Sequence, residues 1–534
     1  MFLRNTPMSV SKIFLIVFYL NIFILFSPPG SGAGDHAGEK PIDRDLSEAH
    51  GVAGISGKRD VKTIPFRLSV QEAVLMALEN NRALDVERFN PAIQKTYEDQ
   101  ELAVFDPKIK AGVSISREED HPLGQLLTSS SGSSAKDVDL SVSEFLPYGT
   151  DISIGIDAGR TSSDRFERRY ESRAGLSITQ ALLKGRGTDE NLATLRQARL
   201  NTSFSEFELR GFTEALVSDV ETSYWEYLLA SYRIGIYEKS LKLAEQQLDE
   251  TREIVNVGRL AETEMVAAQA EVSLRRQELI DAQNVMAAAR LRLIRLLNPD
   301  VPDFWDREII LTDKPFLPYG QPDRLADHID LAMRIRPDMN QARLAIQRQE
   351  LELVKTKNGI LPRMDLFISL GKTGYSTSFG DSLGNMSGDT YDLMAGIRAE
   401  LPFHNRDSNA RHRRALLTKS RAQEALSNLS QLVELDVRMG YIEVNRARQQ
   451  IAASTATREI EEEKVRIETE KFRVGKSTSF LVAQAQRDLV RSQINEINAT
   501  IGNLKALVNL YRLDGSLLER RGIEAPGKEP VEGY

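Results

Sequence analysis

Residues 451–486 read IAASTATREIEEEKVRIETEKFRVGKSTSFLVAQAQ, and they hold the features on which the fold depends. They complete a segment of about residues 408–473 that has no proline and a single glycine. A periodic stretch of this length is typical of a coiled coil or helical assembly, and at 1.5 Å per residue it would extend about 100 Å. Gly475 then predicts a left-handed turn, with a return helix over about 477–513.

An earlier part of the chain has the same pattern. A long proline-free segment, about residues 189–256, is followed by Val257-Gly258 and by an expected return helix over about 260–297. Upstream of the two hairpins, residues 72–107 resemble residues 327–362 without a gap. Because the similar segments keep their order along the chain, we interpret the sequence as a duplication.

Each repeat is expected to contain a first helix, then strands, then a long helical hairpin. The first repeat spans 66–298, with a helix over about 69–104, strands over about 108–182 and a hairpin over about 189–297. The second spans 324–514, with a helix over about 324–358, strands over about 363–402 and a hairpin over about 408–513. A return helix and a first helix together match one long helix in length, so they could stack end to end beside it.

The strand regions alternate apolar and polar residues, which is the pattern of strands with one apolar face. Residues 109–116 of the first repeat show this alternation. The first repeat also holds two extra alternating runs, 138–145 and 152–158, on either side of Pro147-Tyr148-Gly149. These runs predict an additional hairpin in the first half. One chain would therefore supply four strands by the strict repeat, or six with the extra hairpin.

The N-terminus has the pattern of a secretory signal peptide, which we place at residues 1–33. An apolar run at 13–26 follows Arg4 and Lys12 and precedes small and turn-forming residues. The run is shorter than the roughly 20 apolar residues of a membrane span, although an uncleaved anchor is the alternative. Three further segments lack periodicity: we expect a flexible lead-in over 34–65, a proline-rich linker over 299–323 and a flexible C-terminal tail over 515–534.

Composition excludes several classes of function. The 534 residues include 69 Lys+Arg and 77 Asp+Glu, so the net charge of -8 argues against a nucleic-acid binder. The absence of cysteine excludes disulfide frameworks, thiolate zinc sites and cysteine nucleophiles. With only 6 His, no arrangement of catalytic, metal-ligating or cofactor-binding residues is present in the sequence. We therefore expect no enzyme activity, no metal and no cofactor.

The edge strands of the predicted sheet need hydrogen-bonding partners if the sheet enters a membrane. After the signal peptide no apolar stretch is long enough for a helical span, so an exported chain would be soluble or cross a membrane as strands. Open sheet edges are forbidden in lipid, and single-chain membrane barrels begin at about 8 strands. A closed ring of identical chains would remove the edges, and three copies would provide about 12 or about 18 strands.

The sequence resembles the TolC-like outer-membrane efflux channel family over roughly residues 66–514. The resemblance is carried by residues 68–73, by residues 176–183 and by the two Val-Gly turns with Ala-Gln downstream. It implies a mainly α fold with a membrane β-barrel portion and an α-helical periplasmic tunnel, formed by a homotrimer in the outer membrane. It also implies an exit channel that passively conducts small molecules or proteins from an inner-membrane transporter and a periplasmic adaptor.

The same resemblance assigns roles to the hairpin tips. It implies that the adaptor docks on the tips, which here comprise Val257, Gly258, Arg259, Leu260, Val474, Gly475, Lys476 and Ser477. The alternative is that these residues only reverse the chain. Well-studied members place aspartate at the tunnel constriction, but the corresponding positions, six and nine after Gly475, are Leu481 and Gln484. A neutral constriction would gate by packing or dewetting rather than by charge.

A second function remains open at this point, a periplasmic adaptor or structural coiled-coil protein that never enters the membrane. An adaptor would show one hairpin interrupting a lipoyl-like β domain. This sequence has two hairpins in series, each preceded by strands, which favours the channel. The exported substrate and the class of transporter do not follow from the sequence.

Overall fold

The computed structural model describes residues 65–120, 131–163, 166–258, 260–299, 304–315 and 323–531. The expected signal peptide and almost all of the expected lead-in lie outside these residues. The chain divides into two units, Met1–Lys62 and Thr63–Tyr534, and all the described residues belong to the second. Among the residues that have described positions, no helix combines the length and hydrophobicity needed to cross a membrane.

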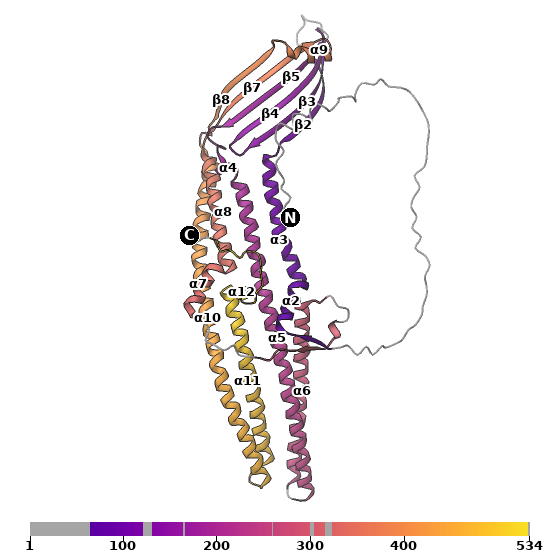
Figure 1. The fold of residues 1–534 in the computed structure, drawn as a ribbon, viewed down its shortest axis with the longest axis vertical. Helices are drawn as coiled ribbons and strands as arrows, with labels where there is room; N and C mark the ends of the chain where they lie inside the picture. The colour runs from indigo at the N-terminus through magenta and orange to yellow at the C-terminus, as the bar shows by residue number, and fades with distance from the viewer. Residues whose placement is uncertain are drawn as a thin grey trace, which may run out of the picture. The chain divides into compact units, whose positions relative to one another are not determined.

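Two long helical hairpins form most of the second unit (Figure 1). The first consists of α5 (Ala193–Asn256) and α6 (Glu262–Leu297), and the second of α10 (Arg406–Arg473) and α11 (Ser479–Leu513). The backbone φ is +74° at Gly258 and +71° at Gly475, which confirms the predicted left-handed turns. A short helix, α4 (Thr188–Asn191), precedes α5. Within each hairpin the two helices pack against each other.

The first helix expected in each half is broken into two, so the prediction of one continuous helix was wrong. The first half has α2 (Val70–Asn80) and α3 (Arg82–Leu102), and the second has α7 (Leu325–Ile335) and α8 (Pro337–Ile360). Asn81 leaves the helical conformation and its side chain accepts hydrogen bonds from the first amides of α3. Pro337 opens α8 and disfavours a helical Arg336 before it.

Both breaks lie where a return helix ends. The Asn81 side chain donates to the carbonyl of Leu296 at 2.9 Å, and Asn298 donates to the carbonyl of Asn80 at 2.9 Å. In the second half, Arg336 at the break donates from Nη1 to the carbonyl of Leu513, the last residue of α11, at 3.5 Å. The return helix therefore meets the broken first helix near its break, as the matched lengths predicted, and both pack along one long helix.

Six antiparallel strands form one sheet in the order β2-β3-β4-β5-β7-β8. Their bounds are β2 Lys108–Asp120, β3 Ser131–Leu146, β4 Thr150–Ser163, β5 Phe166–Ala181, β7 Arg363–Ser376 and β8 Tyr391–Glu400. The two extra alternating runs lie in β3 and β4, which turn through Gly149 with a φ of +85°. The sequence left open whether one chain supplies four or six strands, and this sheet has six. The two halves are joined where β5 of the first half pairs with β7 of the second.

The segment expected as a linker carries structure of its own. Its strand β6 (Ile309–Leu311) pairs in parallel with β1 (Phe66–Leu68). Phe304 and Ile309 are 2% and 3% exposed and belong to the main hydrophobic core, together with residues of α2, α5, α6 and α11. The linker thus fixes the N-terminal end of the first half to the long helices.

The prediction of a flexible C-terminal tail was wrong for residues 515–531, which we call the C-terminal segment. It contains α12 (Leu517–Arg520), and both Leu517 and Leu518 are fully buried. The amide of Val531 donates to Asn340 Oδ1 at 2.9 Å. The segment has too little periodicity to be recognised in the sequence, but the long helix α5 provides an apolar surface on which its leucines pack.

Candidate channel wall and hairpin tips

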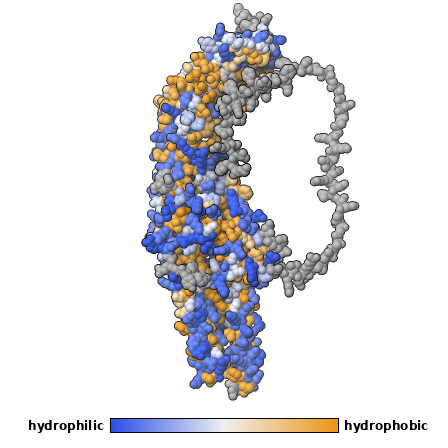
Figure 2. Space-filling model, in the orientation of Figure 1, coloured by the Kyte–Doolittle hydropathy of each residue, from blue (hydrophilic) through white to orange (hydrophobic). Residues whose placement is uncertain are grey.

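One face of the sheet carries a continuous apolar row that crosses all six strands. Its successive cross-strand partners are Ile109, Val142, Ile154, Leu176, Leu370 and Leu393. All except Leu176, which is half-buried, are exposed in the single chain. The opposite face has a row of four serines, Ser143, Ser153, Ser177 and Ser369. Figure 2 shows hydrophobic residues gathered over this sheet. The sheet therefore has one apolar and one polar face.

The sheet ends in two open edges, β2 and β8. Within the described residues neither strand pairs on its outer side. Because six antiparallel strands alternate in direction, the two edge strands run in opposite directions. The edge β8 of one copy can therefore pair in antiparallel fashion with β2 of another.

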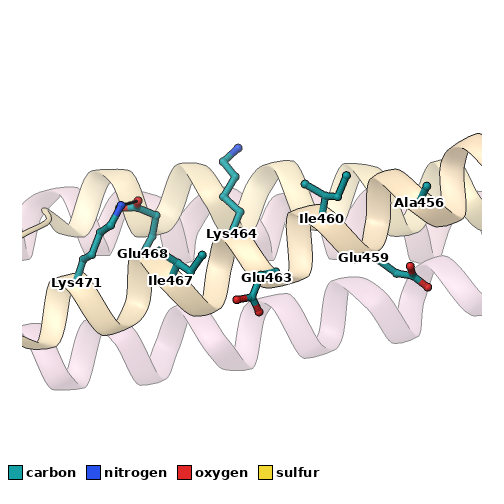
Figure 3. Close-up of a pocket in the computed structure, with 8 residues that line it drawn as sticks. All are labelled: Ala456, Glu459, Ile460, Glu463, Lys464, Ile467, Glu468 and Lys471. Atoms are coloured by element: carbon teal, nitrogen blue, oxygen red, sulfur yellow. Dashed lines mark hydrogen bonds and ion pairs between the residues drawn. The ribbon is translucent and has the colours of Figure 1, made fainter.

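An unpartnered apolar stripe continues below one of these edges, along α10. We define the α10 stripe by Leu432, Leu435, Met439, Ile442, Ala456, Ile460 and Ile467. The first four have the three- and four-residue spacing of a coiled coil, and the last three fall at the same heptad positions further along the helix. Met439, Ile442 and Ile460 are 61%, 65% and 68% exposed. Figure 3 shows the lower part of the stripe, Ala456, Ile460 and Ile467, which lines a pocket together with the charged residues Glu459, Glu463, Lys464, Glu468 and Lys471.

A matching apolar surface lies below the other edge. The helix α3, which leads into β2, exposes Val86, Phe89 and Ile93 at 64%, 66% and 50%. Along the same line α6 exposes Val266 and Ile280 at 68% and 53%. Large apolar side chains at helical spacing on two opposite sides of one chain are the pattern of surfaces that contact another protein or a membrane.

The two hairpin tips lie at the same end of the second unit (Figure 1). Val257 and Val474, just before the glycines, are 71% and 67% exposed. Lys476 is also exposed, whereas the hydroxyl of Ser477 donates to Glu468 at 2.8 Å. Leu260 is half-buried. Arg259 lies outside the described residues.

Polar contacts between α6 and α11 hold the two hairpins together near the tips. Arg487 Nη1 donates to Glu271 Oε2 at 2.7 Å, and Arg275 Nη2 donates to Oε1 of the same carboxylate at 2.6 Å. Ser479 donates to the carboxylate of Glu264. The side chain of Arg275 is 3% exposed and that of Glu271 is 11% exposed, so these charges are largely removed from water. These contacts were not predicted from the sequence.

Leu481 and Gln484, the two residues expected at the constriction, lie on the exposed face of α11. Leu481 is 44% exposed and Gln484 is exposed, whereas Val482 and Ala485 are buried. Residues three apart on a helix lie on the same side, so Leu481 and Gln484 form one exposed patch beside the tip.

The C-terminal segment is tied to α5 by ion pairs in which the residue on α5 is buried. Arg521 forms two hydrogen bonds with the carboxylate of Glu221, at 2.6 and 2.7 Å, and the Glu221 side chain is 2% exposed. Further along α5, Arg210 Nε donates to Glu214 Oε1 at 3.3 Å, and Arg210 also lies 3.5 Å from Glu519. Burial raises the pKa of Glu214 to about 8, although the positive charge of Arg210 acts in the opposite direction.

The raised pKa predicts a pH dependence of stability. The ordinary pKa of Glu214 is 4.5 and the folded value is about 8, so between these values the folded chain holds a proton that the unfolded chain releases. We expect the free energy of unfolding to fall as the pH rises through this window, by on the order of 3–5 kcal/mol, and then to level off. Glu214→Gln should remove most of this slope, measured by denaturant unfolding followed through Trp225. An unchanged slope in the variant would contradict the assignment.

The sequence matches the outer membrane efflux protein family over residues 74–299 and 328–516. This chain belongs to that family. Membership of this family confirms the resemblance stated from the sequence. It also confirms the predicted outer-membrane location and the predicted role in efflux. The alternative of an adaptor or structural coiled-coil protein is not retained, because each of the two hairpins of this outer membrane efflux protein continues from strands of one shared sheet.

Curated relatives of this efflux protein are similar over most of its length. It is 23% identical over 375 residues to the probable efflux pump outer membrane protein TtgC of Pseudomonas putida, a match that covers 68% of this chain and 72% of TtgC. The antibiotic efflux pump outer membrane protein ArpC of Pseudomonas putida matches with the same identity and coverage. The similarity therefore includes both halves of the chain.

Solved structures share the fold. The outer-membrane channel OprN superposes with a TM-score of 0.62 at 15% identity, covering 84% of this chain and 90% of OprN. The Campylobacter jejuni CmeC outer membrane channel also gives 0.62, at 16% identity, covering 84% of this chain and 86% of CmeC. At these identities the likeness concerns the arrangement of helices and strands alone.

Proposed function

We propose that this chain is one subunit of a trimeric exit channel in a tripartite export system. Three copies would join β8 of each to β2 of the next and close a membrane β-barrel, with the apolar row facing lipid. The observation that carries the proposal is the sheet that is apolar on one face and open at two oppositely directed edges. Such edges cannot remain unpaired in lipid, and a ring of identical chains removes them.

The helices would form the periplasmic tunnel below the barrel. The α10 stripe of one copy would pack on the exposed faces of α3 and α6 in the next copy. Each surface continues from the sheet edge on its own side, because α10 follows β8 and α3 precedes β2. Ring closure at the sheet would therefore bring the two helical surfaces together.

Each chain would supply two copies of one unit, over 66–298 and 324–514, joined by the segment 299–323. The structure supports this through equivalent details in the two halves. Both first helices are interrupted, and both return helices are followed by a left-handed residue, Asn298 with a φ of 40° and Gly515 with a φ of 75°. Three such chains would surround the tunnel with six similar units, about one every 60°.

The channel would conduct solutes passively and would carry out no catalytic step. An inner-membrane transporter would supply the energy, and a periplasmic adaptor would connect it to the hairpin tips. The names of TtgC and ArpC, which describe outer membrane proteins of efflux pumps, support this assignment. The proposal includes both small molecules and proteins as exported cargo.

Reconstitution tests this function. The purified protein should be extracted from the outer-membrane fraction, migrate as a heat-sensitive oligomer and produce discrete conductance steps in a planar bilayer. A protein found wholly in the soluble periplasmic fraction, with no conductance, would contradict the proposal.

Adaptor docking predicts a specific effect at the tips. Val474 is exposed and apolar, so a carboxylate there would have to be desolvated when a partner covers it. We expect Val474→Glu to weaken binding of a co-expressed periplasmic adaptor at least tenfold, measured by co-purification. Ala452→Glu, on the exposed surface of α10 away from the tip, is the matched control. Equal adaptor binding by both variants would indicate that the tip residues only reverse the chain.

The constriction residues give a second prediction. If Leu481 and Gln484 face the pore, replacing both with aspartate would place a ring of carboxylates there and favour cations. We expect the reversal potential in a salt gradient to shift toward that of a cation-selective channel. An unchanged cation preference would show that these side chains do not line the pore.

A further inference from the structure

The hairpin of β3 and β4, which we call the inserted hairpin, is an integral part of the sheet. β3 pairs with β2 from Lys108 to Asp120, along the whole length of β2. β4 pairs with β5 from Thr150, with a single register shift between Thr161 and Ser163. The hairpin therefore lies between β2 and β5 and does not project from the sheet.

Its apolar residues are aligned with those of the other strands. Leu140 and Ile156 pair with each other and continue the line from Ala111 on β2 to Ala174 on β5. Their exposed fractions are 43% and 48%. Strands that projected into water would have no reason to carry an apolar face in register with their neighbours. The inserted hairpin thus has the pattern of a lipid-facing wall.

On the polar face of the inserted hairpin, aspartate side chains lie against glycines of the neighbouring strands. The carboxylate of Asp139 lies over Gly112 of β2, and that of Asp137 lies over Gly159 of β4. A side chain at either glycine would collide with the carboxylate. On the second-half strands Asp392 lies over Gly371 in the same way. Glycines thus allow charged groups to lie along the wall, which leaves the space in front of it open to water.

We propose that all six strands of each copy enter the ring, so that β8 meets β2 of the next copy and the trimer forms a barrel of about 18 strands. This inference rests on the proposed function and specifies its membrane part. The occupant of each open edge is a second copy of this chain, because the two edges are antiparallel to each other and continue into the matching helical surfaces.

The strand number sets the width of the exit. Barrel diameter grows roughly linearly with strand number, so six strands per copy in place of four give about a 1.5-fold wider barrel and about a twofold larger cross-section. Barrels of about 16–18 strands hold an aqueous channel. The membrane exit would therefore admit solutes larger than a four-strand subunit allows, and the size limit would lie at the hairpin tips.

Cysteine cross-linking tests which strand meets β8, and the chain contains no cysteine of its own. One cysteine is placed on the apolar face of β8, as Ala395→Cys. It is combined in turn with single cysteines on the same face of β2, at Ile109, Ala111, Val113 and Ile115, or of β4, at Ile152, Ile154, Ile156 and Ala158. A short bis-maleimide is applied to intact outer membranes, because facing residues on paired strands have Cβ atoms only about 5 Å apart.

The proposal expects intermolecular cross-links with one or two adjacent positions of β2 and none with β4. Cross-links with β4 would mean that β2 and β3 lie outside the ring, giving about 12 strands, which overturns this inference but leaves the trimeric channel intact. A monomeric protein without either cross-link would overturn the proposed function as well.

A second set of variants checks the inserted hairpin within one chain. Ala111→Cys with Leu140→Cys, and Ile154→Cys with Leu176→Cys, place facing cysteines on β2–β3 and on β4–β5. Both pairs should form intramolecular cross-links in the membrane-inserted protein. Failure of both pairs, with the oligomer preserved, would show that the hairpin leaves the sheet in the membrane and would contradict the proposal.

Discussion

Arg521→Ala should destabilise the folded chain by about 2–3 kcal/mol, because it leaves the buried carboxylate of Glu221 without its partner, while Arg521 itself is 37% exposed. Glu221 is 2% exposed, and Arg521 is paired with both of its oxygens, at 2.6 and 2.7 Å. A planar guanidinium can form this two-point contact, and removing it strands the charge of Glu221 inside the protein. The free energy of unfolding, followed through the fluorescence of Trp225, which is 8% exposed, measures the effect.

Two controls separate this pair, in which only the carboxylate is buried, from ordinary surface charges. Arg446→Ala removes an equally close pair with Glu443, but those side chains are 61% and 49% exposed, so the expected cost is below about 1 kcal/mol. Adding Glu221→Gln to Arg521→Ala should recover part of the lost stability by neutralising the stranded charge. If Arg521→Ala cost no more than Arg446→Ala, the C-terminal segment would not be held in the way described.

Aspartates in the α10 stripe should abolish trimer formation while leaving the single chain folded. Met439 and Ile442 are 61% and 65% exposed in the chain alone, so Met439→Asp with Ile442→Asp removes little from its own core. In a ring each chain would bury both carboxylates against an apolar helix, at a cost of several kcal/mol for every interface. We expect the trimeric fraction in detergent to fall more than tenfold, with unchanged helix content by circular dichroism.

The control for the stripe is Arg448→Asp. This residue is also exposed on α10, but it lies nine positions after Met439 and therefore on another side of the helix. It should leave the trimer intact. A trimer that tolerates aspartates at both positions of the stripe would show that this surface is not covered by another copy.

The long hairpins could be predicted from the sequence because their signals are local. Proline-free helical spacing and the glycine of each Val-Gly turn act within a few residues, and Gly258 and Gly475 have the expected positive φ. The strands followed from their alternation, including the inserted hairpin with its turn at Gly149. Local chemistry thus accounts for the main elements of the fold.

The missed features depend on contacts between distant segments. The interruption at Asn81 coincides with the end of α6, which is more than 200 positions away in the sequence. The C-terminal segment is ordered because Leu517 and Leu518 pack on a surface formed elsewhere in the chain. No local pattern distinguishes these leucines from those of a loose tail. Propensity is a weak guide where tertiary packing supplies most of the free energy.

The candidate site was only partly accessible from the sequence. The chain reverses at the predicted Val-Gly turns, because a turn is encoded by its own residues, whereas docking at these tips stays a prediction. The contacts that join the hairpins, such as Arg487 with Glu271, are separated by 216 positions and have no local signature. Their charges resemble those of any solvated helix face until the fold brings α6 and α11 together. The α10 stripe could not be singled out from the sequence, because only the folded chain shows that its apolar residues stay exposed.

The central claim is that one chain is an incomplete part of a closed ring, and the mass of the detergent-extracted particle tests it most directly. Light scattering on the protein purified from the outer membrane, with the bound detergent subtracted, gives the number of chains per particle. We expect three. A stable particle that contains a single chain, with both sheet edges and the α10 stripe left uncovered, would contradict the claim.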